Sequence, residues 1–466
     1  MYKIYAYIKF QLMSPLAIGG TTSSVTDKDV LKNAIGEPYI PASALAGVYR
    51  SLFSKEDVRK YFGDVEIVSN NEKAADDKDP AEAIESSVII YDGRLCSDQS
   101  NLSIGIRNGV GLDQFRTVNT GAKYDYEVVE PGSVFWTAIE YSTDDKEEYD
   151  IVDRLLMAWK NEQVMVGGKT TRGLGRLKAL ELKKCRFELP KDIENWLQFD
   201  LYSHHWEACD EWNGEGFHIS DREGFGQIKL TLTLKQESPL TVRVYTTEVS
   251  KDTAAPDYKQ LTYKQEDREI AVIPGTSWAG TFRHSMIQHI GGSYAEACKE
   301  LEELFGRVGV HSSDSQSARS KILFSESYFD DTKDGECYPV VSRNAINRFS
   351  GGAVDTALFT EKIYYGQAKS TLTILIPEDI NSKYLKALAA SIADLHEGFL
   401  TVGGESSIGH GLFSVTQLTM NGVSLTDSLP EDKDNSKKIT GISIYSWILE
   451  RKQAIDNNRE QHKEGV

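Results

Sequence analysis

The amino-acid sequence repeats itself, and this duplication constrains the fold more than any other feature. The phrase Ile-Pro-x-[Ser/Thr]-x-x-Ala-Gly-x-[Tyr/Phe]-Arg occurs at 40–50 and again at 273–283, an offset of 233 residues (273 − 40). Two further pairs keep the same order: Ser-Pro-Leu at 14–16 and 238–240, and a glycine-rich stretch at 166–177 (VGGKTTRGLGRL) and 402–413 (VGGESSIGHGLF). A repeat of this length predicts two domains of one fold, and 466 residues are enough for both.

Both halves show the predicted order strand, helix, strand, strand, helix, strand, which is that of an α+β ferredoxin-like domain. In the first half, a strand at 3–13 and the helix of the repeated phrase are followed by strands at 86–92 and 133–141 and a helix at 151–163. In the second half, a strand at 228–237 and the helix of the repeated phrase are followed by strands at 320–326 and 370–376 and a helix at 384–398. We place the first domain at 1–186, a linker or insertion at 187–227, the second domain at 228–425, and a polar stretch with a C-terminal helix at 426–466. That helix has an apolar face made of Ile444, Trp447, Ile448 and Ile455.

Composition narrows the class of protein. The chain is 40% hydrophobic and 26% charged, and no apolar run approaches the ~20 residues of a membrane span. The five cysteines are scattered without CxxC spacing, so we expect neither a disulfide framework nor a zinc site, and a reducing, cytoplasmic location. His204, His205, Cys209 and His218 in the linker have no familiar metal-ligand spacing either. A net charge of −18 argues against a protein coated in nucleic acid but leaves room for a local basic groove.

The repeated phrase predicts a helix with an unusual glycine. Ser43 and Thr276 are suited to cap it, and Gly47 and Gly280 inside it cost about 1 kcal/mol relative to alanine. Close approach of another backbone, either protein or nucleic acid, would offset that cost. Arg50 and Arg283 follow on the same helices. The alternative interpretation is a tight helix–sheet contact with a surface arginine, and the duplication makes the two about equally favoured.

The glycine-rich stretch is not a phosphate-binding P-loop, because Gln163 stands where that motif requires glycine. It predicts instead a loop able to lie along a backbone. The candidate contacts with an RNA strand are Gly167, Gly168, Lys169 and Arg172 in the first half, and Gly403 and Gly404 in the second. A glycine-rich turn that leads into an edge strand explains either copy equally well.

A polar segment lies between the second and third predicted strands of each half, at 106–132 and 342–366. Both segments carry Arg-Asn, a further arginine, glycines and aromatics, a mixture suited to phosphate contact and base stacking. The candidate residues are Arg107, Asn108 and Arg116, and then Arg343, Asn344 and Arg348. An ordinary polar loop is the alternative.

Together these motifs resemble the RAMP superfamily of CRISPR-associated proteins, most closely the backbone subunits of type III effector complexes, in two fused copies. The resemblance implies a modified ferredoxin-like fold in which the helix after Ile-Pro-x-Ser and the glycine-rich loop line the guide RNA. It implies a hairpin within 108–127 and 345–361 that kinks the guide–target duplex. It also implies partners: guide RNA, target RNA, the large polymerase-like subunit, and neighbouring backbone and small subunits.

In that family an aspartate between the first strand and Ile-Pro-x-Ser cleaves the target. Asp27 is the best positional match, with Asp29 as the near alternative, and Asp257 is the match in the longer loop of the second half. A carboxylate there would hold Mg²⁺ or Mn²⁺, or act as base on the 2′-hydroxyl. Capping of a polar loop is the alternative role. The chain departs from the family pattern in lacking a cysteine zinc site, and in having Glu405 and His410 in its second glycine loop.

We therefore predict a tandem RNA-binding backbone subunit that cleaves target RNA with a divalent cation at one or two sites, Asp27 being the first candidate and Asp257 the second. A non-catalytic architectural subunit of the same complex is the first alternative. A guide-processing ribonuclease using His284 or His289 is the second, and a duplicated ferredoxin-like scaffold without an RNA role is the third.

Overall fold

The structure is a computed structural model with two compact units, and each unit is described by itself. It describes every residue except 21–25, 64–83, 97–101, 113–117, 145–149, 203–205, 207–208, 215–226, 246–255, 266–267, 308–317, 332–335, 427–438 and 465–466. The first unit comprises Met1–Arg107, Tyr124–Thr170 and Leu174–Phe225. The second comprises Asn108–Lys123, Thr171–Gly173 and Gly226–Val466. The described residues between 187 and 214 thus fold with the first unit.

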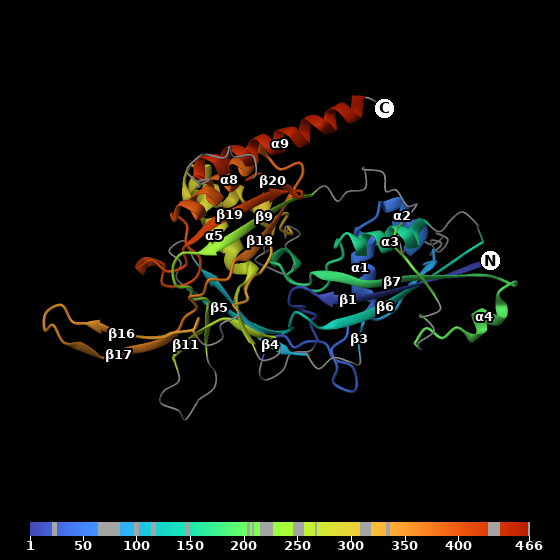
Figure 1. Ribbon diagram of the computed structural model, residues 1–466, viewed down its shortest axis with the longest axis horizontal. Coiled ribbons are helices and arrows are strands. Elements are labelled where there is room, and N and C mark those ends of the chain that lie inside the picture. Colours follow the sequence, from blue (N-terminus) through green and yellow to red (C-terminus); the bar gives the residue numbers. More distant parts are fainter. Residues whose placement is uncertain are drawn as a thin grey trace, which may run out of the picture. The chain divides into compact units, whose positions relative to one another are not determined.

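The first unit has an antiparallel sheet centred on β1 (Tyr2–Leu12), between β6 (Val134–Thr143) and β7 (Leu177–Glu188) (Figure 1). The edges are β2 (Val88–Ile90), with β3 (Arg94–Leu95) beside it on β6, and β8 (Asp210–Glu211) beyond β7. Counted among the predicted strands, the order across the sheet is second, third, first, fourth. This is the ferredoxin-like order, so the predicted fold class is confirmed.

One face of this sheet is covered by helices α1 (Ala42–Ser51) and α3 (Asp150–Lys160), and α2 (Lys55–Phe62) follows α1. Alternate residues of β1, such as Ile8 and Phe10, are fully buried against them, as period-2 patterning predicts. The helices are tied together inside this core because Trp159 Nε1 donates to the Tyr49 hydroxyl at 2.9 Å.

The opposite face of the first sheet is covered by the insertion after β7. This segment contains α4 (Ile193–Gln198) and β8, and its aromatic side chains pack on Tyr5 and Tyr7 of β1. A disulfide joins Cys185 of β7 to Cys209. This differs from the expectation of no disulfide framework, because the fold brings together two cysteines 24 residues apart that sequence spacing alone did not pair.

The second unit repeats the arrangement. Its central strand β9 (Gln227–Gln236) lies between β18 (Ser370–Pro377) and β19 (Phe413–Met420), with β14 (Leu323–Phe324) and β20 (Val423–Ser424) at the edges. Helices α5 (Gly275–Ile290) and α8 (Ser382–Glu397) share one core with this sheet. Helices α6 (Tyr294–Glu300) and α7 (Glu302–Phe305) follow α5, and a three-stranded sheet is formed by β12 (Thr262–Gln265), β13 (Arg268–Ile273) and β15 (Ser327–Phe329). The same strand order in both units confirms the duplication.

Hairpins occupy the polar segments of both halves. In the first half β4 (Ile104–Leu112) pairs with β5 (Val118–Val129). In the second half β16 (Val340–Ile346) and β17 (Ala353–Lys362) belong to a four-stranded sheet with β11 (Tyr258–Gln260) and β10 (Arg243–Tyr245). Figure 1 shows β16 and β17 projecting from the remainder of the second unit.

The C-terminal helix α9 (Gly441–Glu464) packs on α8 of the second unit (Figure 1). Ile444 and Ile448 are fully buried, and Trp447 and Ile455 pack beside them, which confirms the predicted apolar face. Among the helices that the structure describes, none has the length and apolar character needed to span a bilayer.

Candidate nucleic-acid interface

The two most regular repeats in the sequence, Ser-Pro-Leu and the glycine-rich loop, lie against each other in both units. In the first unit three loop amides donate to this segment: Gly168 to Ala17 O at 2.7 Å, Gly175 to Pro15 O at 2.8 Å, and Arg176 to Ser14 Oγ at 2.9 Å. In the second unit the equivalent bonds are Gly404 to Thr241 O at 2.7 Å, Gly411 to Pro239 O at 2.8 Å, and Leu412 to Ser238 Oγ at 2.9 Å. Each loop therefore lies along a backbone, as predicted, but the backbone is its own.

This contact explains why Gly167 and Gly403 are glycines. Their φ angles are +94° and +95°, and a Cβ at either position would lie 2.6 Å from the carbonyl oxygen of Ala17 or Thr241. Only glycine fits such a close approach in the left-handed region. A folding role thus accounts for glycine at 167 and 403, whereas Gly168 and Gly404 bond through their main-chain N–H and have ordinary space for a Cβ.

The glycines of the repeated helices behave differently. A Cβ added to Gly47 or to Gly280 would have no described heavy atom within 4 Å, apart from the helix's own backbone. No described part of the chain therefore makes the close approach that the sequence predicted. Gly47 lies with Ser43 and Arg50, and Gly280 with Thr276 and Arg283, at i, i+4 and i+7 spacing, which places each set on one helix face. The face in the first helix is exposed, so each glycine leaves room for a strand from outside the chain.

The capping prediction for Ser43 and Thr276 is wrong. Helix α1 begins at Ala42 after Pro41, and the Ala42 N–H donates to Asp92 Oδ1 at 2.7 Å. Helix α5 begins at Gly275 after Pro274, without a side-chain cap. Proline at the boundary starts each helix two residues earlier than predicted, which moves both hydroxyls into the first turn.

The two arginines of the repeated phrase also differ. Arg50 Nη1 donates to the carbonyl oxygens of Phe62 and Gly63 at 2.9 and 3.3 Å, and so caps the C-terminal end of α2. Arg283 is half-buried and makes no hydrogen bond or ion pair with a described residue. Arg283 is therefore available to a phosphate, whereas Arg50 is largely used within the fold.

The arginines of the Arg-Asn pairs are held in ion pairs. Arg107 is 4% exposed and pairs bidentately with Glu130, with both N···O distances 2.7 Å. Arg343 lies 2.7 Å from Glu405. The predicted RNA contact therefore does not fit Arg107, whose burial in an ion pair the sequence could not indicate. Asn108 is half-buried on β4, and Asn344 is exposed on β16.

The remaining predicted cations are divided among three environments. Lys169 Nζ lies 4.0 and 3.6 Å from the ring centres of Tyr124 and Tyr126, and burial, with a smaller effect of Lys28, lowers the Lys169 pKa to about 8. This inward position does not suit the phosphate contact predicted for it. Arg172 is half-buried in the short turn η1 (Thr170–Arg172), and Arg348 is exposed near the turn of the β16–β17 hairpin. Arg116 lies outside the described residues.

Asp27 is exposed and forms two hydrogen bonds with β5, the second strand of the β4–β5 hairpin. The Asp125 N–H of β5 donates to Asp27 Oδ2 at 3.0 Å, and the Asp27 N–H donates to Asp125 Oδ1 at 2.9 Å. Oδ1 of Asp27 has no hydrogen bond to a described residue. The alternative candidate, Asp29, accepts a hydrogen bond from the Thr26 hydroxyl.

Asp257 occupies the same place in the second unit. The Thr360 N–H of β17 donates to Asp257 Oδ2 at 2.7 Å, and the Asp257 N–H donates to Thr360 O at 2.9 Å. The register is also the same. Leu16 bridges Val129, four residues after Asp125, and Leu240 bridges Tyr364, four residues after Thr360. The loop lengths left this equivalence open in sequence, whereas the strand register supports it.

The fit of these sites to a divalent cation differs between the halves. Within the described residues no group of three or more His, Cys, Asp or Glu is placed to hold a metal. Mg²⁺ is often held by one or two carboxylates together with water and substrate phosphates. Asp27 and Asp125 supply two carboxylates, whereas Asp257 has the Thr360 hydroxyl as its neighbour. The residues thus fit such an ion, and more fully in the first half.

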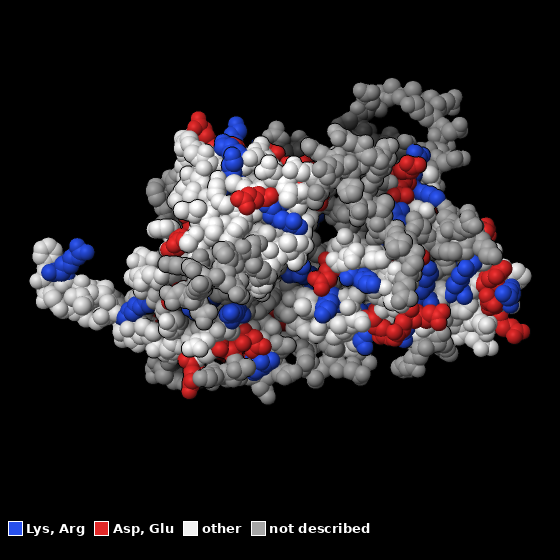
Figure 2. All heavy atoms as spheres, turned by 45° about the horizontal axis from the view of Figure 1, so that its top comes forward, with Lys and Arg blue, Asp and Glu red and all other residues white. Residues whose placement is uncertain are grey.

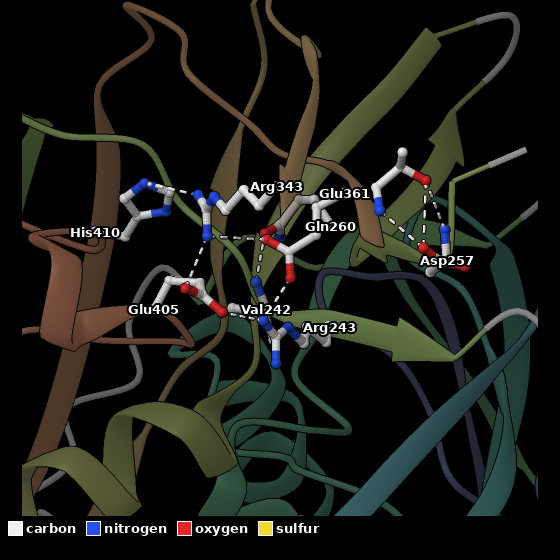
Figure 3. Close-up of polar contacts among 9 residues, drawn as sticks. Val242, Arg243, Asp257, Gln260, Arg343, Glu361, Glu405 and His410 are labelled. Atoms are coloured by element: carbon white, nitrogen blue, oxygen red, sulfur yellow. Dashed lines mark hydrogen bonds and ion pairs between the residues drawn. The ribbon is translucent and has the colours of Figure 1, made fainter. Parts of the chain in front are cut away.

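A charged cluster, which we call the arginine cluster, lies at the base of the second hairpin (Figure 3). It consists of Arg243, Arg343, Glu361, Glu405 and His410. Burial, and then the positive charge of Arg343, lower the pKa of His410 below its usual 6.5. The sequence indicated Glu405 and His410 as departures from the first half, but it gave no signal for Arg243, which lies 162 residues from Glu405.

The histidines considered as catalytic or metal-binding groups are dispersed. His289 Nε2 lies 2.6 Å from Asp394 Oδ2, between α5 and α8, and His284 also has an interaction within the chain. His204, His205 and His218 lie outside the described residues, and Cys209 is in the disulfide. Figure 2 shows acidic and basic side chains interspersed over the face it draws, without a broad patch of one sign.

Comparison with known proteins agrees with the duplicated architecture. The sequence profile of the RAMP superfamily matches residues 9–178 and 234–414, one match in each half and more than half of the chain in total. The chain is also similar to the CRISPR system Cms endoribonuclease Csm3 of Methanocaldococcus jannaschii. The two are 25% identical over 191 residues, which cover 37% of this chain and 77% of that relative.

Proposed function

The chain belongs to the RAMP superfamily, and from this premise we propose that it is a backbone subunit of a type III CRISPR effector complex, which binds guide RNA through both halves and cleaves guide-paired target RNA. The similarity to a Csm3 endoribonuclease supports the complex and the activity. The observation that carries the proposal is the equivalent placement of Asp27 and Asp257 against β5 and β17 in the same register.

The exposed face of α1 and the matching face of α5 are the proposed guide-binding surfaces. Each presents a hydroxyl, a glycine and an arginine in line, and the glycine leaves space for a sugar–phosphate backbone. The hydroxyls of both faces and Arg283 suit phosphate oxygens, which position a strand without reading its sequence, whereas Arg50 is largely bonded to Phe62 and Gly63. Since both halves offer this face, the chain would occupy two adjacent positions along one guide.

The proposed chemistry is attack of a target 2′-hydroxyl on its own 3′-phosphate. The O2′–P bond forms, the P–O5′ bond breaks, and the products are a 2′,3′-cyclic phosphate and a 5′-hydroxyl. Asp27 Oδ1, or the corresponding oxygen of Asp257, accepts the 2′ proton, and the departing 5′ oxygen takes a proton from water. The other carboxylate oxygen, Oδ2, keeps its hydrogen bond to the hairpin strand, which fixes the orientation of the aspartate that acts as general base. In the alternative role, Asp27 and Asp125 would hold Mg²⁺ or Mn²⁺, which would stabilise the charge on the phosphate, and Asp27 would then not be the base.

The wider partners are proposed from the same resemblance: target RNA, the large polymerase-like subunit, and neighbouring backbone and small subunits, in the cytoplasm. The β16–β17 hairpin would contact the guide–target duplex, because its turn exposes Phe349 and Arg348 side by side. An exposed aromatic ring suits base stacking, and an adjacent arginine suits a phosphate.

The proposal is tested by cleavage of labelled target RNA by the complex reconstituted with its guide, in the presence of Mg²⁺ or Mn²⁺. We expect Asp27→Asn and Asp257→Asn each to abolish one product, and the double variant to abolish both, while guide and target binding persist. Asn keeps the size and one acceptor oxygen but removes the charge and the proton acceptor. Asp29→Asn is the matched control in the same loop and should leave the products unchanged.

Unchanged products in all variants, with both RNAs bound, would refute the catalytic assignment and favour the architectural subunit. Loss of a product with Asp29→Asn alone would move the first site to Asp29. A chain purified with its neighbouring gene products but free of RNA would favour a scaffold without an RNA role.

A further inference from the structure

We propose that Arg243 and Arg343 form a binding site for one phosphodiester group of the RNA, and that the carboxylate of Glu405 occupies this site until the RNA displaces it. The inference rests on the proposed RNA-binding function and adds a site to it. The two arginines come from different segments, β10 and β16, and both point at one carboxylate (Figure 3).

The geometry is that of an anion site. Arg343 Nη1 lies 2.7 Å from Glu405 Oε2, and Arg243 Nη2 bonds to Glu405 Oε1. Two guanidinium groups thus contact the two oxygens of a single carboxylate. Arginine is the side chain best suited to bidentate recognition of carboxylate and phosphate alike, so a group that holds one can hold the other.

The arginine cluster contains a second acid, and the two acids have different exposures. The Glu361 side chain is 1% exposed on β17, whereas the Glu405 side chain is 19% exposed on a surface loop. Glu361 lies near both arginines, bonding to Arg243 and lying 3.7 Å from Arg343. Glu361 therefore serves as the permanent counter-ion, and Glu405 is the acid that can leave, because water can reach it and its loop.

Charge balance favours the exchange. The two arginines and two glutamates sum to zero, and a neutral His410 adds nothing. When Glu405 leaves, one positive charge remains uncompensated, and a phosphodiester carries one negative charge. The exchange therefore restores neutrality at the site.

Unsatisfied polar atoms in the cluster point to a larger ligand than a carboxylate. Arg243 Nε and His410 Nδ1 are buried and have no hydrogen bond to a described residue. Glu405 engages only the terminal nitrogen of Arg243 and leaves Nε unused. A phosphodiester offers two free oxygens on a tetrahedral centre, which suits the Nε–Nη edge of one arginine together with the second arginine.

The described residues of the first half have no counterpart of this competing glutamate. Lys169 stands at the position of Glu405, an offset of 236 residues (405 − 169), and both residues have φ of +58°. Lys169 is a cation, and Arg107, the counterpart of Arg343, is paired with buried Glu130 instead. Only the second half would therefore hold its RNA in competition with an internal anion.

The test is the affinity of the full chain for a fluorescently labelled single-stranded RNA, measured by anisotropy over a series of NaCl concentrations. Glu405→Gln removes the competing charge at constant size, so we expect about tenfold tighter binding. The plot of log K against log salt should steepen by about 0.7, the value for one added phosphate contact on single-stranded RNA. Arg243→Met in the Glu405→Gln background should return both quantities to the wild-type values or below.

Glu237→Gln is the matched control, because Glu237 is a carboxylate of the same unit that pairs with Lys235 on the surface. It removes the same charge away from the site and should change the affinity less than about twofold. Equal tightening by Glu237→Gln and Glu405→Gln would overturn the proposal, since net charge alone would then explain the effect. Unchanged or weaker binding by Glu405→Gln, with an unfolding temperature like that of the wild type, would overturn it as well.

Sulfate provides a readout that is independent of RNA. Sodium sulfate should raise the unfolding temperature of Glu405→Gln more than that of the wild type, relative to NaCl of equal ionic strength, and Arg243→Met should remove the difference. If this holds but no form binds RNA, the anion site stands and the proposed RNA function fails. If RNA binds but sulfate has no such effect and Glu405→Gln binds no tighter, only the present inference fails. If Glu405→Gln does not fold, the same comparisons are made with Glu405→Ala.

Discussion

Arg50 and Arg283 occupy the same position in the two copies of the repeated phrase, yet we expect their replacement by alanine to have different consequences. Arg50 bonds to two carbonyl oxygens at the end of α2, at 2.9 and 3.3 Å. Arg283 makes no hydrogen bond or ion pair with any residue that the structure describes. The first is thus predicted to support folding and the second to support RNA binding.

The expected loss of stability follows from the Arg50 contacts. Hydrogen bonds to a charged donor contribute about 1.5–3 kcal/mol when buried. Arg50 is exposed, so water replaces much of the lost interaction, and we expect Arg50→Ala to lower the free energy of unfolding by about 1 kcal/mol. For a unit of this size the unfolding temperature would fall by about 2–4 °C. Arg283→Ala should change the free energy of unfolding by less than about 0.5 kcal/mol.

RNA binding should show the reverse order. Loss of one phosphate contact at Arg283 should lower the affinity about tenfold and reduce the salt dependence of log K by about 0.7. Arg50→Ala should change the affinity less than about threefold, because its guanidinium is already bonded to Phe62 and Gly63.

Thermal unfolding and RNA anisotropy on the same preparations separate the two roles. Arg268→Ala is the control, since Arg268 forms a surface ion pair with Asp330 in the second unit and should affect neither quantity strongly. An Arg283→Ala variant with a lowered unfolding temperature but with the wild-type salt dependence of RNA binding would refute the reasoning. The open face of α5 would then be a folding surface and not a guide contact.

Three further predictions concern the stability of other variants of the chain. Gly47→Ala should raise the free energy of unfolding by about 0.5–1 kcal/mol, because no described atom lies near the added Cβ, but it should weaken RNA binding. Gly411→Ala should lower the free energy of unfolding strongly, because the added Cβ would lie 1.9 Å from Val402 O. Similar effects of the two variants on unfolding would contradict this interpretation. Arg107→Met should lower the free energy of unfolding in urea by about 3–5 kcal/mol, because it leaves the Glu130 charge buried and unpaired; a loss below about 1 kcal/mol would argue against that burial. The pKa of His410 is lowered in the folded state, so its contribution to stability is present above pH 6.5 and is lost as the pH falls through the folded-state pKa. His410→Gln should therefore flatten the plot of unfolding temperature against pH in this range. An unaltered plot would contradict the prediction.

The sequence predicted the elements of the fold more fully than the contacts of its polar side chains. The alternating pattern of 228–237 located β9, and helical spacing located α3 and α8, because burial on one face requires these periods. The Ser43 cap was wrong because proline starts the helix two residues earlier, and the Ala42 N–H donates to Asp92, 50 residues from Ala42. Local pattern cannot indicate a partner at that distance.

The dependence on distant partners also explains which residues remain candidates for RNA contact or catalysis in the structure. Arg107 and Lys169 have the residue type expected of an RNA contact, but tertiary folding directs one to Glu130 and the other to Tyr124 and Tyr126. Asp257 gained support from the strand register, which a loop of different length conceals in sequence. Residue type is therefore informative about chemistry, whereas availability depends on partners far along the chain.

The duplicated phrases separate into two kinds when their contacts are compared. Ser-Pro-Leu and the glycine-rich loop bond to each other through the main chain and through one serine, so their repetition is required by the backbone geometry of each unit. Gly47 and Gly280 have no such internal reason, since no described atom approaches them. A helix that keeps a destabilising glycine twice, on a face with no described intramolecular neighbour, is best explained by a partner that must come close to both helices. The guide RNA proposed above would be such a partner, because an extended strand can present the same backbone to two equivalent surfaces in succession.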